Sequence, residues 1–368
     1  MTAKRNILLN PGPVTLTDRV RKALIRDDWC HREPEFVELT REINTELVRV
    51  YADMEADFSA VMMTGSGTSA VEAMLASFAP DPEAGSTLVL SNGVYGERMA
   101  NMLAAHRKPY YLSQAQWTAP VDMDAAARIL DEHPEITHVT TVHHETTTGR
   151  LNDLDAIGSL CKARNLPLLL DGVSSFAAEA IDAEAWNLAA VAATATKCLH
   201  GTPGLSFVIA RNGLWSEPQA DAGSVYLNLH AYYAGQHGDG YSPFTQAVPA
   251  AFALREALDE LREGGGWAER RRVYRQRASR IAIELTSLNI SMLLKENEYS
   301  CVLRSYLLPD GCGYEQAHDA FKRAGFVIYS GQGQFAENVF RIAHMGAIGT
   351  DDLDALAAAF ADIFGPFA

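Results

Sequence analysis

Short apolar runs alternate with helical patterns between about residues 60 and 210, and this alternation limits the fold more than any other feature of the chain. The expected strands are Ala60–Met63, Thr87–Ser91, His138–Val142, Pro167–Leu170, Leu188–Ala193 and Gly204–Ala210, with a weaker one near Tyr110. Helix-like segments lie between several of them, such as Thr68–Ala79, Gly96–Ala105 and Leu154–Ala163. This spacing predicts an α/β fold whose mostly parallel sheet has helices on both faces.

The remainder of the chain predicts a second, smaller unit. A helix-rich stretch from about Pro249 to Glu284 contains the breaker Gly264–Gly266, and an α+β unit follows from about Ser291. The strands of this unit are expected near Tyr299–Leu303, Gly325–Tyr329 and Asn338–His344. We expect residues 16–255 to form a large domain, and residues 1–15 together with 256–368 to form a small one.

The composition argues against several classes of function. The 368 residues carry a formal net charge of −15, spread along the chain, which disfavours nucleic acid and anionic membranes as partners. No apolar stretch is long enough to span a bilayer, and no apolar secretory core follows the charged start of the chain. The five cysteines include no Cys-x-x-Cys pair, so we expect free thiols in a reducing cytoplasm and no metal site.

Polar residues gather where the expected strands end, and ligands of α/β sheets bind at that edge. Lys197 ends the small-residue run Ala-Ala-Thr-Ala-Thr-Lys, and Asp171 ends the apolar run Leu-Pro-Leu-Leu-Leu. A lysine that follows one buried strand and a carboxylate that follows another form the arrangement needed to hold pyridoxal phosphate. The lysine amine forms a Schiff base with the cofactor's aldehyde, and the carboxylate pairs with the protonated ring nitrogen.

Each of these two residues also has a plainer interpretation. Asp171 could cap a helix, although Ser174 or Ser175 could fill that role equally well. Lys197 could be a surface lysine, but an exposed loop would not need the small residues around it. A lysine desolvated at a strand end should have a lowered pKa, which favours the neutral, nucleophilic amine.

Two turns at strand ends could hold a flat, phosphorylated ligand. Gly65-Ser66-Gly67-Thr68-Ser69 follows a strand and opens a helix, so its N–H groups and hydroxyls predict an anion cup, with a simple helix-capping turn as the alternative. It is neither a P-loop nor a dinucleotide fingerprint. Tyr95, between Gly93 and Gly96, could stack on a flat cofactor or could be a core tyrosine.

The run from His143 to Gly149 places two imidazoles, Glu145 and three threonines at another strand end. A metal site is conceivable there, but consecutive side chains of a strand point to opposite sides. We favour hydrogen bonding to a cofactor over a simple threonine-rich turn. Arg341 could form a fork to a carboxylate or phosphonate, and so could Arg32, for which Glu33 or Glu35 offers a local salt bridge instead.

Together these segments resemble the class V aminotransferases, which are fold-type-I pyridoxal-phosphate enzymes. The resemblance is carried by Leu9–Pro13, Gly65–Thr68, Ser91–Met99, Glu145–Gly149, Asp171–Phe176, Lys197–Gly204, Gly325–Tyr329 and Phe340–Ile342, which cover essentially the whole chain. It implies a mostly parallel seven-stranded sheet, a smaller α+β C-terminal domain and pyridoxal 5'-phosphate as cofactor. It also implies a homodimer with the active site at the subunit interface.

The resemblance further implies a role for each site residue. Lys197 would hold the cofactor covalently and move the proton between substrate and cofactor, Asp171 would hold the ring nitrogen, and Tyr95 would stack on the ring. Thr245 would complete the phosphate cup of the neighbouring subunit. The full cofactor set is Ser66, Gly67, Thr68, Tyr95, Thr146, Asp171, Val173, Thr194, Thr196, Lys197 and Thr245. The substrate set is Arg341, Arg32, Pro11 and Gly12.

Within the family, the segments most resemble enzymes that transaminate 2-aminoethylphosphonate with pyruvate, giving phosphonoacetaldehyde and alanine. The alternative is alanine–glyoxylate or serine–pyruvate transamination, because Asp28–Phe36 resembles the motif of those enzymes and Gln332 replaces a lysine common in phosphonate enzymes. Desulfuration would need a mobile catalytic cysteine, and neither Cys301 nor Cys312 lies in a recognisable loop motif. A nucleotide-binding α/β protein that uses the Gly-Ser-Gly loop without a Schiff base is the last alternative.

Overall fold

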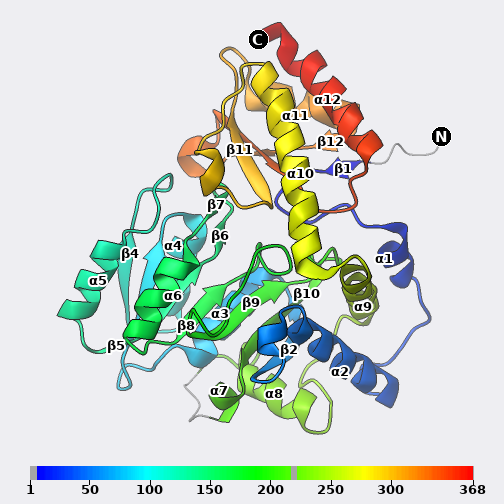
Figure 1. Ribbon diagram of the computed structural model, residues 1–368. Helices are drawn as coiled ribbons and strands as arrows, with labels where there is room; N and C mark the ends of the chain where they lie inside the picture. The colour runs from blue at the N-terminus through cyan, green and yellow to red at the C-terminus, as the bar shows by residue number, and fades with distance from the viewer. Residues whose placement is uncertain (1–5, 217–221, 368) are drawn as a thin grey trace.

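A computed structural model describes residues 6–216 and 222–367, and a seven-stranded sheet forms its centre (Figure 1). The strand order is β2-β10-β9-β8-β5-β3-β4. The bounds are β2 Phe58–Gly65, β3 Ser86–Ser91, β4 Tyr110–Gln114, β5 Ile136–Val142, β8 Leu168–Asp171, β9 Leu188–Thr194 and β10 Gly204–Arg211. β10 is antiparallel to both of its neighbours, whereas the other neighbouring pairs are parallel. The predicted mostly parallel sheet is therefore confirmed.

Both faces of this sheet are covered because successive side chains of each strand alternate between two cores. In β2, Ala60 and Met62 enter one core, whereas Val61 and Met63 enter the other. Helices of the first core include α2 (Pro34–Arg49), α5 (Met123–Glu132), α6 (Leu154–Ala163) and α9 (Val248–Glu263). The second core includes α3 (Gly67–Phe78), α4 (Val94–Ala105) and α8 (Leu229–His237). Short helices α1 (Asp18–Ala23) and α7 (Asn212–Ser216) complete this part of the chain.

A second, antiparallel sheet follows in the order β11-β14-β13. Its strands are β11 Leu303–Leu307, β13 Tyr329–Ser330 and β14 Val339–Ala343, and its helices are α10 Gly266–Ser287, α11 Tyr314–Ala324 and α12 Thr350–Phe364. The N-terminal strand β1 (Ile7–Leu8) pairs in parallel with β12 (Phe326–Val327), so this strand lies among the C-terminal elements (Figure 1). A third core joins Ile7 and Leu9 to residues between Ile281 and Phe364.

The first strand of the second sheet starts later than the sequence indicated. Residues near Tyr299 were expected to be extended in this sheet, but β11 begins at Leu303. The reason is that Ser300 Oγ and the Cys301 N–H donate to the carboxylate of Glu179, at 2.7 Å each. Ser300 and Cys301 are therefore bound to Glu179, which follows β8 of the large sheet. They belong to no described strand of the smaller sheet.

The glycine breaker separates the two long helices as expected. Gly265 has a φ of +93°, which an L side chain rarely adopts, and it precedes the first residue of α10. From there α10 runs from the large sheet's helices to the second sheet (Figure 1). None of the described helices has the length and apolar character needed to cross a membrane. All five cysteines are free thiols, and only Cys30 is exposed.

Candidate active site

The carboxyl ends of the parallel strands bring most of the predicted cofactor residues together. A Cβ placed on Gly67 would lie 2.6 Å from the side chain of Val173 and 3.4 Å from that of Thr194, so these three elements meet at the start of α3. Thr68, Tyr95, Asp171 and Val173 line one small cavity of about 30 Å³. The sequence therefore placed these residues at the correct edge of the sheet.

Lys197 follows β9 and lies against the N-terminal segment of the chain. Its Nζ donates to the carbonyl of Pro11. A Cβ on Gly12 would lie 2.7 Å from Nζ, so glycine leaves room for the amine at this position. Burial lowers the pKa of Lys197 to about 8, an effect to which Arg341 adds and which Asp171 opposes. The amine is therefore neutral far more often at neutral pH than that of an exposed lysine.

Asp171 ends β8 and is 6% exposed. Its Oδ1 accepts from the N–H of Val173 at 2.9 Å, and within residues 6–216 and 222–367 no cation forms a direct ion pair with it. Burial raises its pKa to about 6, an effect that Arg98 and Lys197 oppose. The helix-cap interpretation is wrong, because the residues after Gly172 form turns and no helix. A buried carboxylate without a cation is costly, which suits a site for a protonated ring nitrogen.

The start of α3 is open for an anion. Ser66 is the N-cap residue but its side chain makes no capping hydrogen bond, so the alternative of a simple capping turn is not supported. The free N–H groups of this helix terminus favour a phosphate. The buried Thr196 Oγ1 has no hydrogen-bond partner among the described residues, whereas Thr194 donates its hydroxyl hydrogen to the Leu205 carbonyl at 3.0 Å.

These observations fit pyridoxal phosphate. Among the described residues, the site combines a buried hydroxyl without a partner, a helix N-terminus without a side-chain cap, a buried carboxylate without a direct ion pair and an amine of lowered pKa. Lys197, Asp171 and the start of α3 are the parts that would hold the group.

Arg341 is buried on β14 at 1% exposure and is held on two sides. Its Nη1 donates to the Thr146 carbonyl at 2.6 Å, and its Nε donates to the Ser330 carbonyl at 2.8 Å. Burial lowers the pKa of Arg341, and the guanidinium carbon lies 5.7 Å from the Tyr329 ring centroid. The predicted acid-binding arginine is thus fixed beside the threonine turn that the sequence assigned to the cofactor.

Arg32 and Thr245 are both exposed, and Arg32 contacts the segment that contains Thr245. Arg32 Nη2 donates to the Pro243 carbonyl at 3.2 Å, and in the part of the chain that the structure describes it pairs with neither Glu33 nor Glu35. The side chain of Thr245 is exposed. The local salt bridge considered for Arg32 is therefore absent from the described residues, and neither side chain is buried with Arg341.

The two histidines before the threonine turn have separate surroundings. The ring of His143 lies edge-on to Trp186 at 5.6 Å, and His144 Nδ1 lies 3.4 Å from the Ser174 carbonyl. Burial lowers the pKa of each to about 3, so both are neutral. No group of three His, Cys, Asp or Glu side chains in the described residues could hold a metal ion. The metal interpretation of this run is not supported.

Arg98 is a residue that sequence reasoning missed. Its guanidinium carbon lies 4.8 Å from the Tyr95 ring centroid, and it lines the same cavity as Asp171. The sequence did contain a signal for Arg98, because a residue three positions after Tyr95 lies on the same face of a helix and can contact its ring. Arg98 is the cation that opposes the raised pKa of Asp171.

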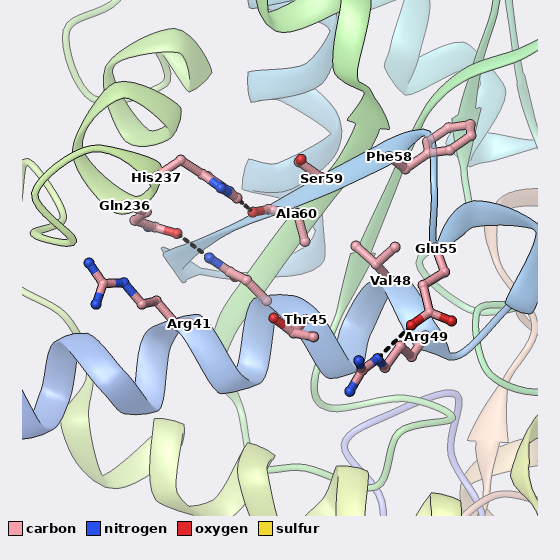
Figure 2. A pocket seen from close by; sticks show the side chains of 11 residues that line it. Arg41, Thr45, Val48, Arg49, Glu55, Phe58, Ser59, Ala60, Gln236 and His237 are labelled. Carbon is pink, nitrogen blue, oxygen red and sulfur yellow. Dashed lines mark hydrogen bonds and ion pairs between the residues drawn. The ribbon is translucent and has the colours of Figure 1, made fainter.

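A larger cavity, of about 460 Å³, lies between α2, β2 and α8 (Figure 2). None of the predicted site residues lines it. Gln236 bonds both the N–H and the carbonyl of Met62, and His237 bonds the carbonyl of Ala60. These contacts cover the open edge of the sheet at β2, which otherwise could pair with another strand.

The fold and the site define a pyridoxal-phosphate enzyme of fold type I, an aminotransferase. Residues 33–303 match the family described as aminotransferase class-V. The chain belongs to this class V aminotransferase family.

Relatives and a solved structure agree with this assignment. A Phocaeicola vulgatus protein named 2-aminoethylphosphonate–pyruvate transaminase is 33% identical over 95% of this chain and 96% of its own. A Clostridioides difficile protein, named bifunctional phosphonoacetaldehyde hydrolase/aminoethylphosphonate transaminase, is 32% identical over 95% of this chain, which spans 55% of that longer protein. The crystal structure of a subgroup IV aspartate aminotransferase from Thermus thermophilus superposes with a TM-score of 0.88 at 25% identity, over 99% of this chain and 100% of that one.

Proposed function

We propose that this aminotransferase transfers the amino group of 2-aminoethylphosphonate to pyruvate, giving phosphonoacetaldehyde and alanine. The observation that carries the proposal is the buried guanidinium of Arg341, held by two carbonyls near Lys197. A guanidinium fork can bind either a phosphonate or a carboxylate, so one residue can serve both substrates. The names of the relatives that match nearly the whole chain support the phosphonate as the amine donor.

Pyridoxal phosphate, when bound, supplies an aldehyde that captures amines and a ring that withdraws electrons from the substrate carbon. Asp171 would hold the ring nitrogen, and Tyr95, at the start of α4, would stack on the ring. The N–H groups of Gly67 and Thr68 would hold the phosphate, together with the Thr196 hydroxyl, which has no partner among the described residues. Val173 packs against Gly67 beside the phosphate.

Lys197 would take the proton from the substrate carbon that bears the amine and deliver it to the carbon that the cofactor's aldehyde supplies. A base for this step needs a pKa close to the working pH, and burial brings the amine to about 8. Pro11 and Gly12 lie against the amine, and they limit the water that reaches it. The carbonyl of Thr146 accepts from Arg341, and its hydroxyl would contact the cofactor's phenolic oxygen.

The enzyme acts as a cytoplasmic homodimer in this proposal. Thr245 and Arg32 are exposed side chains of two segments that touch through Arg32 and the Pro243 carbonyl, outside the buried cluster around Lys197. They would reach the neighbouring subunit's site, where Thr245 completes the phosphate cup. The five free thiols, four of them buried, suit a reducing compartment.

Two measurements test the proposal. Borohydride reduction of the holoenzyme should fix a pyridoxyl group to Lys197, and Lys197→Ala should take none. Purified enzyme given 2-aminoethylphosphonate and pyruvate should form alanine and phosphonoacetaldehyde in equal amounts. No alanine from this pair, with glyoxylate consumed in place of pyruvate and an amino acid as donor, would support the alanine–glyoxylate or serine–pyruvate alternative.

Desulfuration is a weaker alternative on structural grounds. Cys301 and Cys312, the two cysteines considered for it, are 6% and 7% exposed. The Sγ of Cys301 also lies 3.5 Å from the Ala178 carbonyl in packed surroundings. Burial raises the pKa of both thiols, which disfavours the thiolate that desulfuration needs.

A further inference from the structure

The helix that carries Tyr95 has no cap of its own. α4 starts after Gly93, which has no side chain to accept from the first N–H groups of the helix. The N–H of Val94 donates to Thr147 Oγ1 at 3.1 Å. The N–H groups of Tyr95 and Gly96 donate to Glu145 Oε2 at 3.2 and 3.4 Å. A turn that follows another strand therefore satisfies the first three donors of α4.

Glu145 has the position that an N-cap side chain would otherwise occupy. It is 0% exposed, and a Cβ on Gly93 would lie 2.3 Å from its carboxyl carbon. Its second oxygen, Oε1, accepts from the N–H of Thr147 at 3.1 Å and from Thr147 Oγ1 at 2.5 Å. Both oxygens are thus used, one toward α4 and one toward the turn that directly follows Glu145.

The same turn also holds the substrate arginine. Thr146, between Glu145 and Thr147, accepts from Arg341 Nη1 at 2.6 Å through its carbonyl. Three consecutive residues therefore contact the start of α4 on one side and the guanidinium of β14 on the other. A displacement of this turn would move Tyr95 and Arg341 together.

We propose that Glu145 is a positioning residue that fixes the Tyr95 ring and the Arg341 guanidinium relative to each other. It contacts neither substrate nor cofactor and acts through α4 and through Thr146. The inference rests on the roles proposed above for Tyr95 and Arg341. Glu145 would affect the rate only through the placement of these two groups. A shift of about 1 Å in a positioned group can lower the rate on the order of 100-fold.

Residue 145 must supply two acceptor oxygens, one for the N–H groups of α4 and one for Thr147. In Glu145→Gln one oxygen becomes an NH₂ group, which donates and cannot accept. If the NH₂ faces α4 it opposes the N–H groups of Tyr95 and Gly96, and if it faces the turn it opposes the N–H of Thr147. The variant keeps the volume of glutamate, so the core around it stays filled.

The experiment compares Glu145→Gln and Thr147→Val with Asp122→Ala as the control. Asp122 caps α5 through a 2.8 Å bond from the Ala125 N–H to Oδ1, so its loss also uncaps a helix on the same sheet. The measurements are the Tm of each holoenzyme, the Kd for pyridoxal phosphate, the visible circular dichroism of the bound cofactor, and KM for donor and acceptor.

We expect a lower Tm in all three variants. Glu145→Gln and Thr147→Val should also raise the Kd for the cofactor about tenfold or more, change the dichroic band and raise both KM values. Asp122→Ala should leave these three readouts at wild-type values. The inference is wrong if Glu145→Gln lowers only Tm, as the control does, or if the cofactor readouts change while both KM values stay the same. A failure of the proposed function would be recognised separately, in the wild-type enzyme. That enzyme would then bind no cofactor through Lys197 or would use other substrates.

Discussion

The guanidinium of Arg341 donates to the carbonyl of Thr146 at 2.6 Å, across 195 positions of sequence. This bond joins β14 of the smaller sheet to the turn after β6 (His144–Glu145) of the large-sheet side. The residue proposed to bind the substrate's acid group is therefore anchored to the residue proposed to bind the cofactor. Because Nε is also held by the Ser330 carbonyl, the plane of the guanidinium is set before any substrate arrives.

Arg341→Lys should reduce kcat/KM for donor and acceptor alike. Lysine keeps the charge but loses the fork and the bonds to two carbonyls, and a charged hydrogen bond contributes about 1.5–3 kcal/mol, or roughly 10- to 150-fold. Steady-state kinetics with each substrate varied in turn measures this. Arg280→Gln is the control, since Arg280 forms partly exposed ion pairs with Glu284 and Asp354. A loss confined to the phosphonate half-reaction would contradict a shared binding residue.

The lowered pKa of Lys197 predicts a pH profile for covalent cofactor capture. The amine reacts when unprotonated, so the capture rate by the cofactor-free enzyme should rise with pH and level off above about 8, the pKa that burial gives it. With an exposed lysine of pKa about 10.4 the rate would rise across the whole range, and at pH 7 the neutral amine would be about 200-fold scarcer. Stopped-flow absorbance from pH 6 to 10 distinguishes the two. A midpoint of the pH profile near 10 would show that water reaches the amine and that burial does not lower its pKa.

Asp171 adds a second pH dependence, which has the same sense but lies at lower pH. Its pKa is raised to about 6, so the carboxylate is present above that value and is lost as the pH falls below it. Cofactor affinity should therefore weaken below pH 6, because a protonated carboxyl cannot pair with the ring nitrogen. Asp171→Asn should bind the cofactor about 10- to 100-fold more weakly at pH 8 and lack this part of the acid-side fall. Equilibrium titrations of both proteins at several pH values measure the difference, and identical acid-side slopes would rule out Asp171 as its origin.

The elements of the sheet could be predicted from the sequence because their apolar runs are short, fully buried and bounded by turns. Lys197 and Asp171 could be predicted for the same reason, since each is a polar residue directly after such a run. The contacts of Glu145 could not, because the missing cap of α4 becomes visible only when a turn about 50 positions later is folded against Gly93. β11 started late because Glu179, far away in sequence, binds the residues before it.

Gly12→Ala should slow cofactor capture by crowding Lys197. The added Cβ would lie 2.7 Å from Nζ, and the φ of +114° strains any L side chain. Gly311→Ala is a matched control, because Gly311 has a φ of +82° with open space around its Cβ position. Both variants should lose about 1 kcal/mol of stability or somewhat more from backbone strain, but only Gly12→Ala should reduce the capture rate. Equal capture rates in the two variants would show that the N-terminal segment moves away from Lys197 freely.

A subunit-mixing experiment tests whether Thr245 serves the neighbouring site. Thr245→Asp places a carboxylate on an exposed side chain, so the fold should persist, but it would repel the cofactor's phosphate across the interface. Lys197→Ala removes the essential amine from its own site. Each homodimer should therefore be inactive or nearly so.

In a mixed dimer, one site receives Lys197 from the Thr245→Asp chain and Thr245 from the Lys197→Ala chain. That site is native in both respects, so refolding or coexpressing the two variants should restore activity, to about a quarter of the wild-type level if equal amounts of the chains combine at random. Activity that returns only after mixing requires a site built from two chains. If Thr245→Asp alone is fully active, or if mixing restores nothing while hybrids form, Thr245 has no role in the partner's phosphate cup.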